Sequence, residues 1–269
     1  MKSASILSDL AVQLARRQIR VVDLTAPLSD DTPVIKLPPE RGQPWPFRRE
    51  VISRYDEKGE EVYWNNISMS EHTGTHFDAP VHWASGKEFA DVSQVPAQDL
   101  VGPAAVIDMS EHIGTPDFLL ERRHVEHWCE RHGPLPENGW LLYRTGWDAK
   151  DGDARSFLND GHTPGIGVAC AKWLAEETPI KGIGVETVGT DAGQAGKLNP
   201  PYPVHWYMHG ANKYGLTQLK NLKRLPATGA ILVVSPLPIV GGSGSPCRAY
   251  ALVADDLSAE RPDRIGLTN

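Results

Sequence analysis

An α/β fold in a single domain is what the sequence predicts, and three observations lead to it. Short apolar runs rich in β-branched residues alternate with stretches of helical periodicity along the chain. No segment repeats and no clear linker divides the 269 residues. The content of 40% hydrophobic and 23% charged residues is that of a soluble globular protein.

The elements follow in order from the N-terminus. In residues 3–18, apolar positions recur every three or four residues without a proline, which predicts an amphipathic helix. We expect residues 1–20 to lie on the outside of one domain, residues 21–269, or across a subunit interface. A strand predicted at 20–28 leads into a proline-rich extended segment. Further strands are predicted at 49–54, 61–69, 104–108, 140–144, 180–187 and 230–235, and helices at 118–132 and 168–177.

Composition excludes several classes of protein. The net charge of −7 and the scattered basic residues predict no nucleic-acid partner. Residues 1–20 contain charges and no uninterrupted apolar run, so they predict neither a secretory signal nor a membrane span. Cys129, Cys170 and Cys247 form no CxxC pair, and we expect them to be ordinary thiols in a reducing cytoplasm.

One short stretch concentrates the chemistry. Residues 70–83, SEHTGTHFDAPVHW, place His72, His76, Asp78 and His82 within eleven positions. Each histidine alone is typical of a surface or core residue, but together they predict a metal site, since first-row divalent ions favour imidazoles with a carboxylate. A site with three protein ligands keeps positions open and therefore suits catalysis.

The residues between these ligands predict a tight loop after a strand. Gly74 allows sharp backbone geometry, while Thr75 and Pro80 make a regular helix unfavourable. We expect the two imidazoles of His72 and His76 to converge in this loop.

The order of these residues resembles a known family. His72, Gly74, Thr75, His76, Asp78, Pro80 and His82 match the H-x-G-T-H-x-D-x-P-x-H signature of the cyclase-like metal-dependent hydrolases, which include bacterial kynurenine formamidase and isatin hydrolase. The resemblance extends from Val22 to Val253 and includes the TGW at 145–147. It implies a swivelling β/β/α fold with mixed sheets and peripheral helices, and a homodimer or higher oligomer. It also implies that His72, His76 and Asp78 hold a divalent ion beside His82, the base or proton carrier.

Two features bear on the branch of this family. In the formamidase branch, a glutamate twelve positions after a histidine helps to hold a second zinc; here His205 is followed at that distance by Thr217, which predicts a single metal. The segments 189–196, 200–201 and 242–246 resemble isatin hydrolase. That resemblance implies a small aromatic cyclic amide such as isatin as substrate and Mn²⁺ as cofactor, with Zn²⁺ and Fe²⁺ also compatible with the ligands.

Within that interpretation, His82 and His205 are the expected catalytic residues, and His205 either orients the substrate or carries a proton. A buried histidine bonded only to backbone is the alternative for His205. The expected substrate contacts are Trp64, Trp83, Trp206 and Gln218, since flat aromatic side chains suit a bicyclic amide. Core positions for the tryptophans and an exposed helical position for Gln218 stay open as alternatives.

Three other functions compete with this interpretation. Kynurenine formamidase would need the second metal. A non-catalytic metal-binding module on the same fold would not need His82. An iron oxygenase shares the two-histidine, one-carboxylate ligand set but not the surrounding signature.

Overall fold

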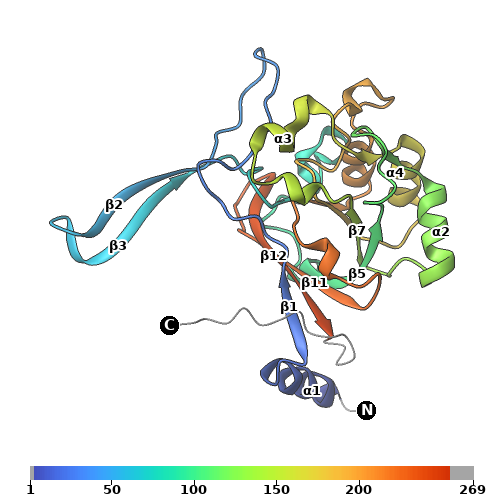
Figure 1. Cartoon of the computed structure of the whole chain (residues 1–269), viewed down its shortest axis with the longest axis horizontal. Coiled ribbons are helices and arrows are strands. Elements are labelled where there is room, and N and C mark those ends of the chain that lie inside the picture. Colours follow the sequence, from blue (N-terminus) through green and yellow to red (C-terminus); the bar gives the residue numbers. More distant parts are fainter. Residues whose placement is uncertain (1–2, 255–269) are drawn as a thin grey trace.

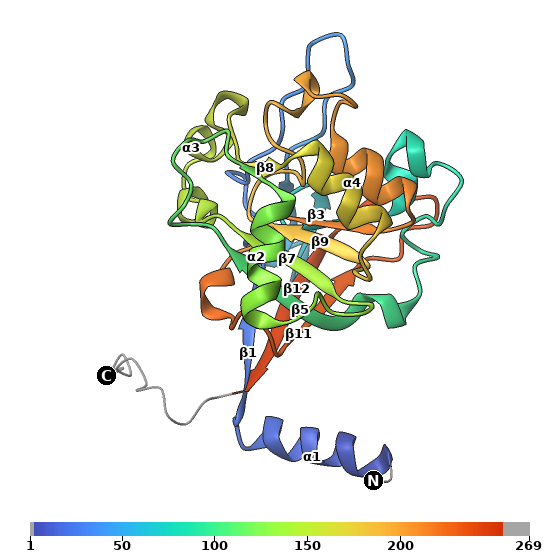
Figure 2. The same cartoon turned by 90° about the vertical axis from the view of Figure 1, so that its right-hand side faces the viewer.

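A mixed sheet forms the centre of the computed structural model, which describes residues 3–254 (Figures 1 and 2). Its strand order is β1-β12-β11-β5-β7-β9-β10-β4, and an additional pairing of β12 with β4 closes the sheet into a ring. The strands are β1 (Ile19–Asp23), β4 (His76–Asp78), β5 (Val101–Asp108), β7 (Trp140–Arg144), β9 (Gly182–Val185), β10 (Tyr214–Thr217), β11 (Ala230–Pro236) and β12 (Gly244–Ala254).

Both strand directions occur in this ring. β5, β7, β9 and β10 are parallel neighbours, whereas β11, β12, β1 and β4 pair antiparallel. The predicted α/β class with mixed strands is confirmed. The strand predicted at 140–144 has the observed bounds, and that at 180–187 is shorter, Gly182–Val185.

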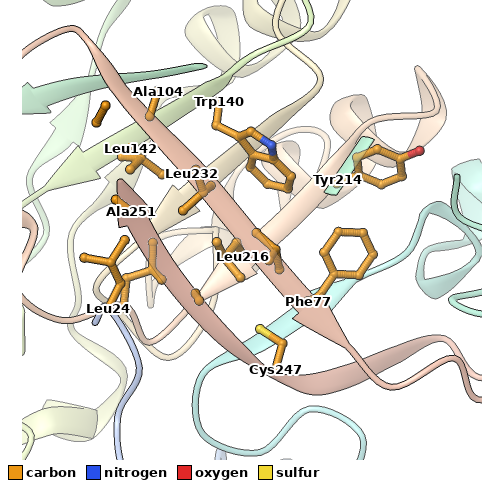
Figure 3. Close-up of a cluster of buried hydrophobic side chains, with 14 of the residues drawn as sticks. Leu24, Phe77, Ala104, Trp140, Leu142, Tyr214, Leu216, Leu232, Cys247 and Ala251 are labelled. Atoms are coloured by element: carbon orange, nitrogen blue, oxygen red, sulfur yellow. The ribbon is translucent and has the colours of Figure 1, made fainter. Parts of the chain in front are cut away.

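Apolar side chains fill the inside of the ring (Figure 3). Phe77, Trp140 and Leu216 are fully buried there, because every second residue of a strand points to the same face. Burial of each such side chain stabilises the fold by roughly 1.5–3 kcal/mol. Phe77 lies between His76 and Asp78, so the strand that carries the expected ligands is anchored by the core.

Helices cover the outer face of the parallel strands (Figure 2). α2 (Arg122–His132) and α4 (Val168–Glu176) contribute Val125, Trp128 and Leu174 to a second apolar cluster, while α3 (Ala154–Leu158) is a short helix between them in sequence. The helix predicted at 118–132 begins later, at Arg122. The preceding β6 (Leu119–Leu120) pairs with β8 (Gly165–Ile166) instead.

Two elements extend away from this body (Figure 1). β2 (Arg48–Asp56) and β3 (Gly59–Ser68) form a separate two-stranded sheet, here called the arm. α1 (Ser3–Ala15) lies beside the start of β1 and ends before the predicted residue 18, because Arg17 adopts a left-handed φ of 56°. The division into a helical segment 1–20 and a domain 21–269 stays a prediction, and residues 1–2 and 255–269 lie outside the described residues.

A buried carboxylate joins two strand ends. Glu186 follows β9, and its Oε2 accepts hydrogen bonds from the backbone of Thr145 and Trp147 and from the Thr145 hydroxyl. Its Oε1 has no hydrogen-bond partner among the described residues. Burial raises the pKa of Glu186 to about 7, although these hydrogen bonds act in the opposite direction. The TGW segment, residues 145–147, therefore binds this side chain through its hydrogen-bond donors.

No helix within residues 3–254 is long and apolar enough to cross a membrane.

Candidate metal centre and active site

Asp78 lies at the point where three strands meet. In β4 it pairs with Gly215 of β10 on one side and with Gly244 of β12 on the other. A Cβ at Gly215 would lie 2.8 Å from Asp78 Oδ2, and one at Gly244 would lie 2.6 Å from the His72 ring. The two glycines therefore leave the space that the carboxylate and the imidazole occupy. The segment 76–78 is a strand rather than the predicted loop, because both neighbours pair with it.

The turn before β4 has the tight geometry expected of it. Gly74 has a φ of 67°, which favours glycine. Thr75 is buried, and its hydroxyl accepts from the Ala26 amide and donates to the Gln218 carbonyl. After β4, Pro80 opens a 3₁₀ turn (Pro80–His82) that carries His82 back towards the cluster.

Hydrogen bonds fix which nitrogen of His72 faces Asp78. His72 Nε2 lies 2.9 Å from the Ser243 hydroxyl, which itself donates to Glu71. Since the serine proton is used on Glu71, Ser243 accepts from Nε2–H, and this network assigns the lone pair to Nδ1. His72 Nδ1 lies 2.8 Å from Asp78 Oδ1. Two such atoms at this distance share a cation, which is either a metal ion bound by both or a second proton on the ring.

His76 is oriented in the same manner. Its Nδ1 lies 2.8 Å from the Gly74 carbonyl, a bond that only a ring N–H can donate, so Nε2 carries the lone pair. That Nε2 lies 3.4 Å from Asp78 Oδ1. The Thr217 hydroxyl contacts the same ring, 2.9 Å from Nδ1 and 3.1 Å from Nε2.

Two groups of three residues bring their ligand atoms within 4.8 Å of one another among the described residues. One is His72, Asp78 and His82; the other is Asp78, His205 and His209. Asp78 is common to both groups. His76 stands outside the first group by this measure, although its Nε2 is close to Asp78.

His205 and His209 lie on one π-helical turn (His205–His209). Asp191 Oδ2 accepts from His205 Nδ1 at 2.5 Å, and its two oxygens also accept from the Val204 and His205 amides. His209 Nδ1 donates to the Lys213 carbonyl at 3.0 Å. Histidines that bind a metal or take part in a reaction typically have such a hydrogen bond on the ring nitrogen that points away from the site.

Sequence reasoning did not assign Asp191, His209, Glu71 or Ser243. The glycine-rich segment that follows β9 contains Asp191, and the His-x-x-x-His spacing contains His209. Both patterns are visible in the sequence, but only the fold shows that His209 lies close to Asp78 and that Asp191 binds His205.

The carboxylate of the cluster is charged at pH 7, whereas three of its imidazoles are neutral. Burial acts to raise the pKa of Asp78, but His76 and His72 outweigh it and hold this pKa well below its usual range. Burial lowers the pKa of His76 to about 4, of His82 to about 2 and of His209 to about 4. These three rings are therefore neutral at pH 7, the form that binds a metal.

His205 differs from its neighbours. Burial acts to lower its pKa, but the hydrogen bond and charge of Asp191 outweigh it, and the pKa of His205 is raised. The rings of His82 and His205 lie 5.5 Å apart between centroids. The environment of His82 thus favours the neutral form of its imidazole, whereas the environment of His205 favours the charged form.

The predicted substrate residues do not all lie together. Trp83 contacts His205 with a centroid distance of 4.7 Å and Tyr202 at 5.5 Å. Trp206 follows His205 and is 43% exposed. Trp83, Tyr202 and Trp206 are here called the aromatic rim. Trp64 lies on the arm, 56% exposed, so its expected substrate contact stays a prediction.

Gln218 is buried at the end of β10, not exposed on a helix. Its Nε2 lies 3.4 Å from the Pro33 carbonyl, and its Oε1 has no hydrogen-bond partner among the described residues. An unpartnered buried acceptor is costly unless a water or ligand satisfies it.

Comparison with known proteins agrees with this geometry. The family described as Putative cyclase matches residues 22–192. Isatin hydrolase of Roseibium aggregatum is 42% identical over 261 residues, which cover 94% of this chain and 99% of that protein. A kynurenine formamidase of Bacillus thuringiensis is 30% identical over 234 residues, covering 85% and 95%.

A solved structure extends the likeness to the fold. The crystal structure of an isatin hydrolase bound to the product analogue thioisatinate has a TM-score of 0.92 and 40% identity, and the match covers 95% of this chain and all of that one (100%). Fold, signature residues and sequence identity thus agree, and the chain belongs to the cyclase family.

Proposed function

We propose that this protein is a metal-dependent amidohydrolase that opens the cyclic amide of isatin, or of a similar small aromatic compound, to the corresponding carboxylate. The observation that carries the proposal is the set of imidazole lone pairs directed at the buried Asp78 carboxylate, in a chain closely similar to isatin hydrolase. The aromatic rim beside these groups suits a flat bicyclic substrate.

His72, His76 and Asp78 are the proposed metal ligands. The donor set fits a divalent ion, because each imidazole has its other nitrogen bonded to Ser243 or to the Gly74 carbonyl. We favour Mn²⁺, and Zn²⁺ is compatible with the same ligands. When bound, such an ion lowers the pKa of a coordinated water towards about 7 and polarises a carbonyl oxygen.

His82 is the proposed proton acceptor. Its ring lies 4.0 Å from that of His72 between centroids, which places it beside the proposed ligands. It takes the proton of the attacking water and gives it to the amide nitrogen as the ring C–N bond breaks.

His205 is proposed to donate a hydrogen bond to a substrate carbonyl. Asp191 fixes its Nδ1, so its Nε2 is the nitrogen available to the substrate. An N–H directed at developing negative charge stabilises the transition state, and the neighbouring carboxylate stabilises the charged imidazole. Trp83 and Trp206 would contact the aromatic ring, while Trp64 and the unpartnered Oε1 of Gln218 are further proposed contacts.

A single metal ion is part of the proposal. Thr217 offers a hydroxyl where the formamidase branch has a carboxylate, and a neutral hydroxyl is a weak ligand. Kynurenine formamidase is the second candidate, and the observation that favours it is the group of Asp78, His205 and His209, which offers a place for a second ion.

We also propose a homodimer in the cytoplasm. The three free cysteines Cys129, Cys170 and Cys247 support a reducing compartment. The exposed arm and α1 support assembly, since each presents apolar side chains without a covering layer.

The substrate proposal is tested by product analysis. The purified protein, stripped of metal and reloaded with Mn²⁺, is incubated with isatin and, separately, with N-formylkynurenine. We expect a product heavier than isatin by one water and no formate release. Formate from N-formylkynurenine without isatin opening would assign the second function instead.

A further inference from the structure

A chain of hydrogen bonds leads away from the metal centre. It starts at the nitrogen of His72 that does not face Asp78, because Nε2 lies 2.9 Å from the Ser243 hydroxyl. That hydroxyl donates to Oε2 of Glu71 at 2.9 Å, and the same oxygen accepts from the Ser243 amide at 3.0 Å. His72, Ser243 and Glu71 are here called the relay. Neither Ser243 nor Glu71 is a proposed ligand or catalytic residue.

Glu71 sets the direction of the hydrogen bond between His72 and Ser243. A serine hydroxyl has one proton, and it can either donate to an imidazole nitrogen or accept from one. A carboxylate only accepts, so the hydroxyl proton goes to Glu71 and the ring supplies the proton between His72 and Ser243. Nε2 of His72 therefore keeps its proton. Nδ1, 2.8 Å from Asp78 Oδ1, is left for the cation that the two groups share.

His76 reaches the same state with a simpler partner. Its Nδ1 donates to the Gly74 carbonyl, a group that can only accept. His72 has a serine in the corresponding place, and a serine without an acceptor of its own could donate to Nε2 and leave the ring proton on Nδ1. In that tautomer the N–H of His72 would point at Asp78 and oppose the binding of an ion there. The acceptor that Glu71 provides disfavours this tautomer.

The loop between β11 and β12 holds Ser243 in place. The Ser243 carbonyl accepts from the Ala79 amide at 3.0 Å, directly after β4, and the Gly242 carbonyl accepts from the Val92 amide at 2.9 Å. A Cβ at Gly242 would lie 2.9 Å from Glu71 Oε1, so the glycine leaves room for the carboxylate. The loop is thus bonded to two other segments, and its shape allows Glu71 to reach the serine.

We propose that Glu71 and Ser243 are positioning residues that select the metal-binding tautomer of His72 and thereby set the affinity of the centre for its divalent ion. The inference rests on the metal centre proposed above and extends it to two side chains that are not ligands themselves. The carboxylate at the end of the relay also stabilises the positive charge that the ring takes up when an ion binds.

The first test is metal affinity, which does not depend on the substrate. Loss of an outer hydrogen-bond partner of a metal-binding histidine typically costs about 10–100-fold in affinity. Calorimetric titration of the metal-stripped protein with Mn²⁺ should therefore show binding at least about tenfold weaker in Ser243→Ala than in the wild type, and a loss of similar size in Glu71→Ala. Wild-type affinity in Ser243→Ala would overturn the proposal.

The double variant Glu71→Ala, Ser243→Ala separates a relay from two independent contacts. Glu71 acts on His72 through the Ser243 hydroxyl, so its removal should have little further effect once this hydroxyl is gone. The double variant should bind Mn²⁺ within about threefold of Ser243→Ala. Independent roles would instead multiply the two losses, to about a hundredfold or more, and would overturn the relay.

Conservative variants and a spectroscopic measurement test the chemistry of the relay. Ser243→Thr keeps a hydroxyl, and Glu71→Gln keeps an oxygen that accepts from it, so each should bind Mn²⁺ more tightly than the matching alanine variant. Nitrogen NMR of the metal-free, histidine-labelled protein reads the ring proton directly, with the signal of His72 assigned by its absence from His72→Ala. Nε2 should carry a hydrogen in the wild type, and Glu71→Ala should shift the ring towards the tautomer with hydrogen on Nδ1. An unchanged spectrum in Glu71→Ala would contradict the assignment.

Glu88→Gln and Ser235→Ala are the matched controls. The Glu88 side chain is 86% exposed, and Ser235 is an exposed residue of β11. Both variants should bind Mn²⁺ as the wild type does. The relay variants should unfold at the wild-type temperature without metal, whereas earlier unfolding would indicate a merely structural role and overturn the proposal. A wild type that binds no divalent ion would contradict the proposed function, and wild-type binding that the relay variants share would contradict the relay alone.

Discussion

Gly244→Ala should damage the metal centre although it replaces none of the proposed ligands. The ideal Cβ at this position lies 2.5 Å from the Phe77 carbonyl oxygen, 2.6 Å from His72 Cε1 and 3.1 Å from His72 Nδ1, where ordinary contact begins at 3.4 Å. Relief of the overlap thus requires a displacement of about 1 Å, either of the His72 ring or of the pairing between β12 and β4. Overpacking of this kind costs about 1–3 kcal/mol of stability, and a 1 Å misplacement can cost about 10²-fold in rate.

The experiment compares metal content, isatin turnover and thermal unfolding of Gly244→Ala with those of Gly152→Ala. A Cβ at Gly152 meets nothing within 4 Å, so the control should keep wild-type values. We expect Gly244→Ala to remain folded, bind less metal and lose about 10²-fold in turnover. Wild-type metal content and turnover in this variant would refute the close packing of β12 against His72 on which the site geometry depends.

Four further predictions follow from the same contacts. Asp78→Ala should abolish metal binding and turnover, and a retained ion would remove Asp78 from the ligand set. His82→Ala should keep the metal and lose about 10²–10⁴ in rate; loss of the metal would make His82 a ligand. Asp191→Ala should lower kcat/KM about 10–100-fold with partial recovery in Asp191→Asn, whereas equal losses in both would exclude the hydrogen bond to His205 as the cause. The raised pKa of Glu186 contributes stability that is complete below about pH 4.5 and is lost as the pH rises through about 7. The free energy of unfolding of Glu186→Gln, measured by chemical unfolding, should therefore increase relative to that of the wild type between pH 5 and pH 8, by up to about 3 kcal/mol. A difference in the free energy of unfolding that does not change with pH would contradict the raised pKa.

Local sequence patterns predicted those helices and strands whose formation depends mainly on their own residues. The strand 140–144 and the helix that begins at Val168 are continuous apolar or periodic segments, and both lie where the sequence places them. β12 was not predicted, because its first residues, Gly244, Ser245 and Pro246, are typical of a loop. They form a strand because β4 pairs with all three, while β11 pairs with the residues that follow them, Cys247 to Leu252.

The residues of the candidate site were likewise predicted only in part. The signature residues His72 to His82 are adjacent in sequence, and the structure brings them around Asp78. His205 was predicted through a resemblance, whereas its partner Asp191 lies fourteen residues earlier on another loop. The contact between them is created by the turn after β9, which no spacing rule describes. Ser243 and Glu71 were missed for the same reason, since 172 positions separate them.

One divalent ion held beside Asp78 is proposed to be essential for opening the cyclic amide. Elemental analysis of the purified protein, with isatin absorbance followed in the same preparation with and without added Mn²⁺, tests it most directly. We expect one ion per chain and loss of isatin that depends on manganese. Two ions per chain with formate release from N-formylkynurenine and no isatin turnover would contradict it, and would mean that His209 compensates for the carboxylate absent at Thr217.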